Sequence, residues 1–335
     1  MEKKEQKTML RSSSNERRQQ ITLIAIILAV CVLWAIASPS FLTIQNFTNI
    51  IHQMSVLCIM SYGMTVVLIS GGVDLSMGFM IAFSGIVCAM IIQNGPEGDH
   101  DGNIALAIAA GILSGSVVGF INGAVVARLG LPPYIATLAM QMCLRGMSYL
   151  LPGLGPVYLS QDVAFRNIAQ TRIGDVLPLP FIYAIVLGLL LWFFLRKTVL
   201  GRRFFAIGSN GEAARLSGIN LASTRTWAYI VASTFAAIAG VVHCARINAG
   251  MQTSGQGMEG DGVVASVMGG TSMAGGHGTL FGCFIGSFFM TLLKNGLNLL
   301  KINTNWQFIL IGLCLVISVW IDKIRRERAM STLSE

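Results

Sequence analysis

Charge is scarce in this sequence. Only 11% of its 335 residues are charged and 54% are hydrophobic, whereas soluble globular proteins carry about 25% charged residues. A membrane-spanning helix needs roughly 20 mostly apolar residues, so the chain has room for about eight to ten spans. The alternating pattern of a membrane β-barrel is also missing. The composition therefore predicts an all-α polytopic membrane protein with about ten transmembrane helices.

The sequence also lacks the usual marks of a catalytic or metal site. Its four histidines are scattered, its seven cysteines form no C-x-x-C pair, and all seven lie in apolar runs. Metal ligands need closer spacing than this, so we expect no metal and no catalytic residue. The dipeptide Gly-Lys is absent, which excludes a P-loop. If ATP drives this protein, another chain binds it.

Positive charge is present, with a formal net charge of +8, but it is concentrated in three clusters at residues 3–18, 196–225 and 323–328. Each cluster adjoins an apolar run, which is the positive-inside pattern of membrane proteins and not a nucleic-acid surface. Both termini and the segment 197–225 are therefore predicted to be cytoplasmic. Residues 94–103, with three acids and no Lys or Arg, are predicted to lie outside.

This charge pattern divides the chain into a basic cytoplasmic tail (1–20), a transmembrane domain (21–322) and a cytoplasmic tail (323–335). The short, Gly-rich segment 262–272 is the weakest span, and we expect a broken or re-entrant helix there. The predicted apolar spans are 21–38, 49–70, 77–93, 104–127, 134–151, 180–196, 226–247, 262–272, 279–300 and 305–322.

Two spans carry glycines at every fourth residue. Such a stripe allows two helices to approach backbone to backbone in lipid, and helix packing is the simpler interpretation of each stripe. The two stripes lie on spans of opposite direction, which hints at an inverted repeat. They consist of Gly115, Gly119 and Gly123, and of Gly278, Gly282 and Gly286.

The segment 197–225 carries a short polar helix between two long apolar runs. Ser209 followed by Glu212 fits a capping box, and Gly218 suits a helix C-cap, so we predict a helix over about 210–217. A helix this short is marginal in water. Either it packs on its own protein or it docks a soluble partner, and composition does not decide between them. The candidate coupling residues are Ser209, Asn210, Glu212, Ala213, Ala214, Arg215, Leu216, Ser217 and Gly218.

Carboxylates at two breaks in the apolar sequence are candidates for helix caps or for the translocation path. Asp74 and Ser76 precede the 77–93 span, where capping of free N–H groups is favoured over a substrate contact. Glu259 and Asp261 stand at the outer start of the 262–272 span, where they would complement the helix dipole or contact a docking protein or a polar solute. Asn122, inside the 104–127 span, belongs to the same candidate set.

Several separated motifs, in order from about residue 20 to 322, make the chain resemble the permease subunit of bacterial ABC sugar importers of the ribose type. These motifs are GGVDLSMG (71–78), LPPYIATL (131–138), GRRFFAIGSNGEAARLSGIN (201–220), GMEGD (257–261), MGGTSMAGGHG (268–278), and KNGLNLL followed by NWQ (294–307).

The resemblance implies a monosaccharide permease of the bacterial inner membrane. Its implied partners are a second permease copy or a paralogue, a cytoplasmic ATPase that binds ATP and Mg²⁺, and a periplasmic or extracellular sugar-binding protein. It also implies that Ser209–Gly218 is the coupling helix seated in the ATPase, and that transport proceeds by alternating access.

Three alternatives to a sugar importer stay open. A branched-chain amino acid or a signalling molecule could be the solute. A secondary transporter could use Asp74 to carry protons or sodium ions, because intramembrane carboxylates serve this role in pumps. A polytopic membrane enzyme would need clustered histidines and carboxylates at one depth, and the scattered histidines argue against it.

Overall fold

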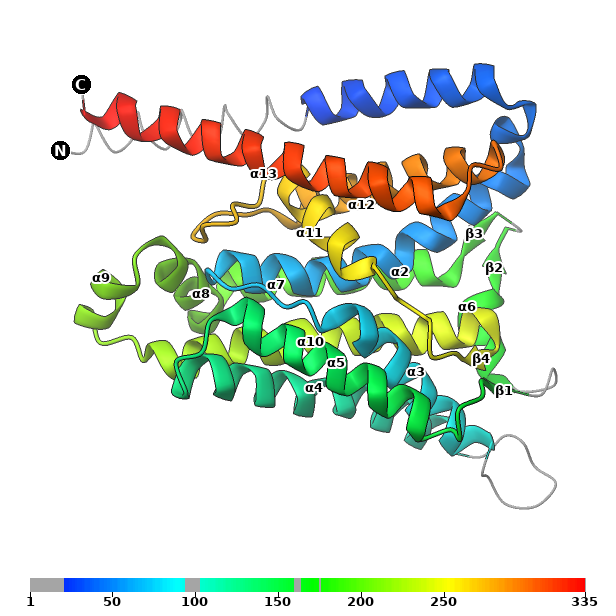
Figure 1. Cartoon of the computed structure of the whole chain (residues 1–335), viewed down its shortest axis with the longest axis horizontal. Coiled ribbons are helices and arrows are strands. Elements are labelled where there is room, and N and C mark those ends of the chain that lie inside the picture. Colours follow the sequence, from blue (N-terminus) through cyan, green and yellow to red (C-terminus); the bar gives the residue numbers. More distant parts are fainter. Residues whose placement is uncertain (1–20, 94–102, 160–163, 175, 335) are drawn as a thin grey trace.

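The computed structural model describes residues 21–93, 103–159, 164–174 and 176–334, and these are predominantly helical (Figure 1). Every predicted span overlaps a helix, although residues 269–272 of the span 262–272 lie beyond the helix there. The helices at the predicted spans are Ile21–Ala37, α2 (Ile44–Ile69), α3 (Met77–Gln93), α4 (Ile104–Arg128), α5 (Pro133–Leu150), α7 (Leu179–Lys197), α10 (Leu221–Ile247), α11 (Met258–Met268), α12 (Leu280–Leu299) and α13 (Thr304–Ser334).

Short elements connect these helices. Two pairs of two-residue antiparallel strands, β1 with β4 and β2 with β3, lie at the end of the molecule opposite α9 (Figure 1). The short elements are η1 (Pro39–Leu42), β1 (Val157–Tyr158), η2 (Ala164–Arg166), α6 (Asn167–Gln170), β2 (Arg172–Ile173), β3 (Leu177–Pro178), α8 (Val199–Ser209), α9 (Gly211–Leu216) and β4 (Ala249–Gly250).

The predicted fold class, an all-α polytopic membrane protein, is confirmed, but the count of ten spans is not. Among the residues that the structure describes, five helices, α2, α4, α7, α10 and α12, are long and apolar enough to cross a membrane. The helix at the weakest predicted span, α11, has 11 residues and is therefore roughly 16 Å long, about half of a 30 Å hydrocarbon core. This length fits the broken helix that we expected there.

The arrangement of the helices repeats. In the first unit the long helix α2 is followed by a non-helical segment, the shorter α3, the Gly-striped α4 and α5; the second unit repeats this order with α10, a non-helical segment, α11, α12 and α13. The helices α2 and α10 pack against each other in opposite directions, α4 packs on α10, and α12 packs on α2 (Figure 1). The third helix of each unit thus packs on the first helix of the other unit, which is the pattern that an inverted repeat produces.

The glycine stripes lie at close backbone contacts, the first between α4 and α10 and the second between α12 and α11. A Cβ atom at Gly119 would stand 2.5 Å from the carbonyl oxygen of Tyr229 on α10, and one at Gly123 would stand 2.6 Å from Cα of Thr226. Gly115 contacts α10 in the same way, and Gly282 and Gly286 contact the backbone of α11 and of Gly269, which follows it. The prediction that Gly278 belongs to the second stripe is wrong, because α12 begins only at Leu280 and this glycine lies before the helix.

We expect Gly119→Ala to destabilise the protein and Gly146→Ala to leave it unchanged or slightly stabilised. The added methyl at Gly119 meets α10 backbone atoms at 2.5 and 2.7 Å, and overpacking of this kind costs about 1–3 kcal/mol. A Cβ at Gly146 on α5 meets nothing within 4 Å, and Ala is the better helix former by about 1 kcal/mol. Melting temperatures in detergent measure both; equal melting temperatures for the two variants would contradict the contact.

Candidate functional site

The predicted coupling segment consists of two helices that protrude at one end of the molecule (Figure 1). The chain leaves α7 at Lys197 and forms α8, whose residues Phe204 and Ile207 are buried in the protein. Ring packing of Phe204 on Phe194 of α7, with centroids 6.2 Å apart, fixes the corner between the helices. The apolar face of α8 therefore anchors the segment, and the shorter α9 follows it.

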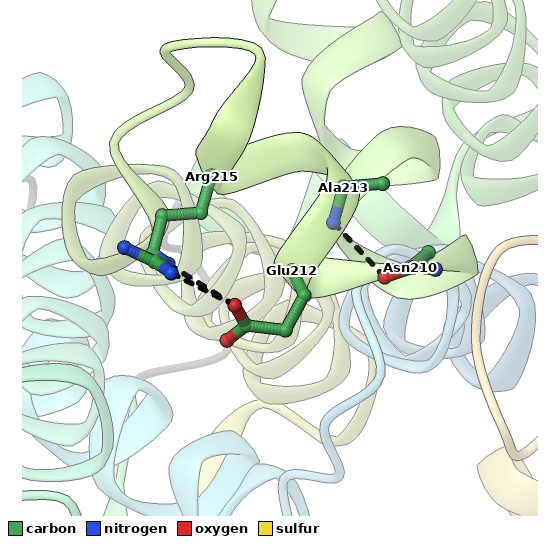
Figure 2. A network of polar contacts seen from close by, with 4 residues as sticks. All are labelled: Asn210, Glu212, Ala213 and Arg215. Carbon is green, nitrogen blue, oxygen red and sulfur yellow. Dashed lines mark hydrogen bonds and ion pairs between the residues drawn. The ribbon is translucent and has the colours of Figure 1, made fainter.

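The predicted capping box at the start of α9 is wrong by one residue. Asn210 is the N-cap: its side-chain oxygen accepts from the N–H of Ala213 at 3.0 Å (Figure 2). Ser209 is the last residue of α8, so its backbone is not in the extended conformation that an N-cap needs. Glu212 does not reach back but forms an ion pair with Arg215 at 3.0 Å (Figure 2).

The predicted C-cap at Gly218 is confirmed. Gly218 has φ of +82°, the left-handed conformation that glycine adopts without strain. Its N–H donates to the carbonyl oxygen of Arg215 at 3.0 Å, and the N–H of Ile219 donates to that of Ala214 at 3.0 Å. This pair of bonds is a Schellman motif, so both ends of a six-residue helix are capped.

Helix α9 presents nearly all of its side chains to the outside. From Asn210 to Gly218 only Ala214 is buried, and Leu216 is 80% exposed. A helix of this length is not stable by itself, and α9 packs mainly on α8 and less on α10. The exposed Leu216 and the charged pair Glu212–Arg215 form a small amphipathic surface that is available to a partner.

The base of this segment contacts two other parts of the bundle. The N–H of Gly276, in the loop between α11 and α12, donates to the carbonyl oxygen of Ile69 at the end of α2 at 2.8 Å. Gly208 of α8 lies against both Ile69 and Gly276 with no room for a Cβ atom. Ser209 donates to the carbonyl oxygen of Gly276 at 3.5 Å. A force on α9 would therefore reach α2 and the loop before α12.

Asp74 is the centre of a buried polar cluster, and not simply a helix cap. Its Oδ1 accepts from the N–H of Ser76 at 3.0 Å and from Ser76 Oγ at 2.5 Å. Its Oδ2 accepts from Ser233 Oγ on α10 at 3.1 Å. Asn122 of α4 donates to Ser76 Oγ at 3.0 Å and to Asp74 Oδ1 at 3.5 Å.

This cluster holds three helices together at the start of α3. Asp74, Ser76 and Ser233 are fully buried and Asn122 is 1% exposed. Ser76 Oγ donates to the Asp74 carboxylate and not to a backbone carbonyl. Beside the cluster, the hydroxyl of Tyr229 donates to the carbonyl oxygen of Val73 at 3.3 Å. The structure thus brings three of the predicted candidates, Asp74, Ser76 and Asn122, into one contact set.

Glu259 and Asp261, in the first turn of α11, have separate partners. Asp261 forms an ion pair with Lys294 of α12, and Glu259 Oε1 accepts from Gln141 Nε2 of α5 at 2.9 Å. The N-cap residue before the helix is Gly257, whose φ is +81° and which supplies no side-chain cap. The expected complement to the helix dipole is present, but each carboxylate also ties α11 to another helix.

Sequence reasoning missed Ser233, Lys294 and Gln141. The available signal was a polar residue inside an apolar run, which is costly in a membrane unless it finds a partner. The three residues nevertheless lie 159, 33 and 118 positions from their acidic partners. No local pattern connects such distant positions.

Comparison with known proteins places this architecture among membrane transport components. The family model described as branched-chain amino acid transport system / permease component matches residues 46–319. The ribose import permease protein of Escherichia coli (strain K12) is 36% identical over 307 residues, which cover 91% of this chain and 93% of that protein. No solved structure gives a significant match.

Two further relatives have a similar extent. The galactose/methyl galactoside import permease protein of Haemophilus influenzae is 34% identical over 301 residues, covering 86% of this chain and 89% of the relative. The D-allose transport system permease protein of E. coli (strain K12) is 31% identical over 303 residues, which cover 90% of this chain and 91% of the relative.

Proposed function

Because this chain belongs to the family of branched-chain amino acid transport system permease components, we propose that it is the membrane-spanning subunit of an ATP-driven importer of a monosaccharide. The observation that carries the proposal is similarity over about nine-tenths of the chain to permeases named for ribose and allose import. A third relative is named for galactose and methyl galactoside. A simple neutral sugar is therefore the substrate class.

The family description itself names branched-chain amino acids, which keeps a different small solute as the second candidate. Two observations favour the sugar. The three relatives described above carry sugar names, and the sequence motifs between residues 71 and 307 resemble sugar permeases of the ribose type.

The permease works with partners that supply energy and solute. An ABC importer has an ATP-binding subunit and a solute-binding protein, and this chain, which has no Gly-Lys dipeptide and so no P-loop, takes the transport role without an ATPase site. We propose that ATP and Mg²⁺ are bound by the cytoplasmic partner. We further propose a permease pair, formed by two copies of this chain or by this chain and a paralogue.

Helix α9 is proposed as the element that docks the ATPase. It is capped at both ends, exposed along its length, and connected through Gly208 and Gly276 to the end of α2 and to the loop before α12. When the ATPase pair closes on ATP, its movement would reach the bundle through these contacts. Alternating access then opens the permease outward to receive sugar and inward to release it.

The importer resides in the inner membrane with several spans, and we propose that both termini are cytoplasmic. The basis is the position of the Lys and Arg clusters; residues 1–20 and 94–102 lie outside the residues that the structure describes.

Single cysteines in a cysteine-free variant test this orientation. A cysteine at position 99 should react with an impermeant thiol reagent added outside intact cells, and one at position 209 should react only after the membrane is opened, because the positive-inside rule puts the two segments on opposite faces. Reaction of both from outside would show that the orientation is wrong.

Uptake of radiolabelled D-ribose, D-allose and D-galactose tests the function. Cells that produce the permease with its ATPase and binding protein should accumulate one of these sugars, and an inactive ATPase variant should not. A proton uncoupler that leaves ATP high should have little effect. Uptake that survives ATPase inactivation but collapses with the uncoupler would identify an ion-coupled transporter.

A further inference from the structure

The first turns of α3 and α11 meet inside the helix bundle. Each helix follows a non-helical segment that leads inward from one end of the molecule, residues 70–76 before α3 and the turns at 251–257 before α11, and both helices begin near its centre (Figure 1). A Cβ atom at Gly78 would stand 2.8 Å from the carbonyl oxygen of Gly255 and would overlap the carboxylate of Glu259. In secondary transporters, paired interrupted helices of this kind mark substrate sites near the bilayer midplane.

Polar and charged side chains of α5 gather beside this crossing. Gln141 donates to Glu259 Oε1 at 2.9 Å. The guanidinium of Arg145 lies over the ring of Phe79, the residue after Gly78, at 5.8 Å from its centroid. Since Gln141 and Arg145 are four residues apart, they occupy one face of α5. We call Gln141, Arg145 and Glu259 the crossing cluster.

The crossing cluster has unused hydrogen-bonding capacity. Within the part of the chain that the structure describes, the Oε2 atom of Glu259 is buried and has no hydrogen-bond partner. Arg145 is exposed, so its five N–H donors are open to a ligand. Lone pairs and donors of this kind can exchange hydrogen bonds with the hydroxyl groups of a polar molecule.

Lipid is an unsuitable neighbour for this face of α5. Charged side chains inside a membrane face the bundle interior or a water-filled cavity, because burying them in hydrocarbon is costly. Helix α5 is also not one of the five helices apolar enough to span the membrane by composition. By contrast, α7 exposes Leu189, Leu190 and Phe193, a surface that suits lipid. A water-filled path beside this face of α5 would meet the requirement of Arg145.

We propose that the crossing cluster binds the hydroxyl groups of the sugar midway through the membrane. This inference rests on the proposed function, and it names the residues that the sugar meets. The Glu259 carboxylate accepts hydrogen bonds from hydroxyl groups, the Arg145 guanidinium donates them, and the Gln141 amide does both. One acid and one base leave the cluster without net charge, which matches a neutral polyol better than an amino acid or another ion.

Transport by the complete importer, with its ATPase and binding protein, tests the role in binding. We expect Gln141→Ala and Arg145→Ala each to lower sugar uptake at least tenfold and to change the ratio of D-ribose to D-galactose uptake. ATPase co-purification and ATP hydrolysis should stay near wild type. Cys143→Ala is the matched control, because Cys143 lies on the opposite side of α5, about 200° around the helix from Gln141, and should transport normally.

A labelling experiment tests the aqueous path without relying on transport. In a variant without the accessible cysteines Cys31, Cys143 and Cys314, cysteine at position 141 should react with a small charged methanethiosulfonate reagent, and added sugar should slow the reaction. Cysteine at position 189 on α7 should react poorly, because it faces lipid.

The possible outcomes separate the two proposals. Unchanged uptake and unchanged sugar ratios in both variants would overturn the cluster, as would an unreactive cysteine at position 141. Loss of ATPase co-purification together with uptake would show a structural role and would also overturn it. If the wild-type importer transports no sugar but position 141 reacts, the path stands and the assignment of sugar as substrate fails.

Discussion

Replacing Leu216 by Asp will abolish ATP-driven uptake while the permease still inserts in the membrane. Leu216 is 80% exposed at the end of α9, so the change removes little contact within the chain and should change the melting temperature in detergent only slightly. If α9 seats in the ATPase, a carboxylate in place of an apolar anchor leaves a charge buried at the interface. Changes at such hot spots typically cost about 2 kcal/mol or more of binding free energy. ATPase co-purification should fall in parallel.

Gly218→Val tests the same helix through its backbone. Valine in the left-handed conformation at φ +82° costs at least about 1–2 kcal/mol, so the Schellman motif should open and α9 should fray. Gly211→Ala is the control, since a Cβ at Gly211 meets nothing within 4 Å and the residue lies in the helix. Wild-type uptake and wild-type co-purification in both Leu216→Asp and Gly218→Val would show that α9 does not dock the ATPase.

The second large effect is expected at Asp74. Asp74→Ala removes the acceptor of Ser76, Ser233 and Asn122 in a fully buried site. Each buried donor left without a partner costs about 1–3 kcal/mol of stability. The free energy of unfolding should therefore fall by more than the roughly 1 kcal/mol that an ordinary helix cap contributes. Unfolding in detergent measures it, and we expect poor yield and a markedly lower melting temperature. Asp74→Asn keeps one acceptor oxygen and should be milder in both measurements.

Coupling between side chains distinguishes this structural role from ion transport. Ser233→Ala alone should cost less than Asp74→Ala, and the double variant should lose less than the sum, because the two share one hydrogen bond. Asp74→Asn should keep most ATP-driven uptake. A well-folded Asp74→Asn protein without uptake, combined with wild-type uptake that a proton uncoupler abolishes, would instead support the ion-coupled transporter.

The sequence by itself determined the fold class and the place of most helices. Long apolar runs leave the backbone no partner in lipid except itself, so they must be helices, and each predicted span overlaps one. Local chemistry was also sufficient for Gly218, because a left-handed C-cap depends on one residue and its immediate neighbours. The glycine stripes predicted close contacts for the same reason, since their spacing places every member except Gly278 on one helix face.

Only the tertiary structure decided which residues meet. Ser209 and Asn210 are both good N-caps by composition, and the choice fell to Asn210 because α8 packs its buried face on the bundle and extends helical conformation through Ser209. The partners of Asp74, Asp261 and Glu259 come from other helices. Their pairing depends on how helices cross and on the register of each contact, which is a property of the packed bundle and of no single segment.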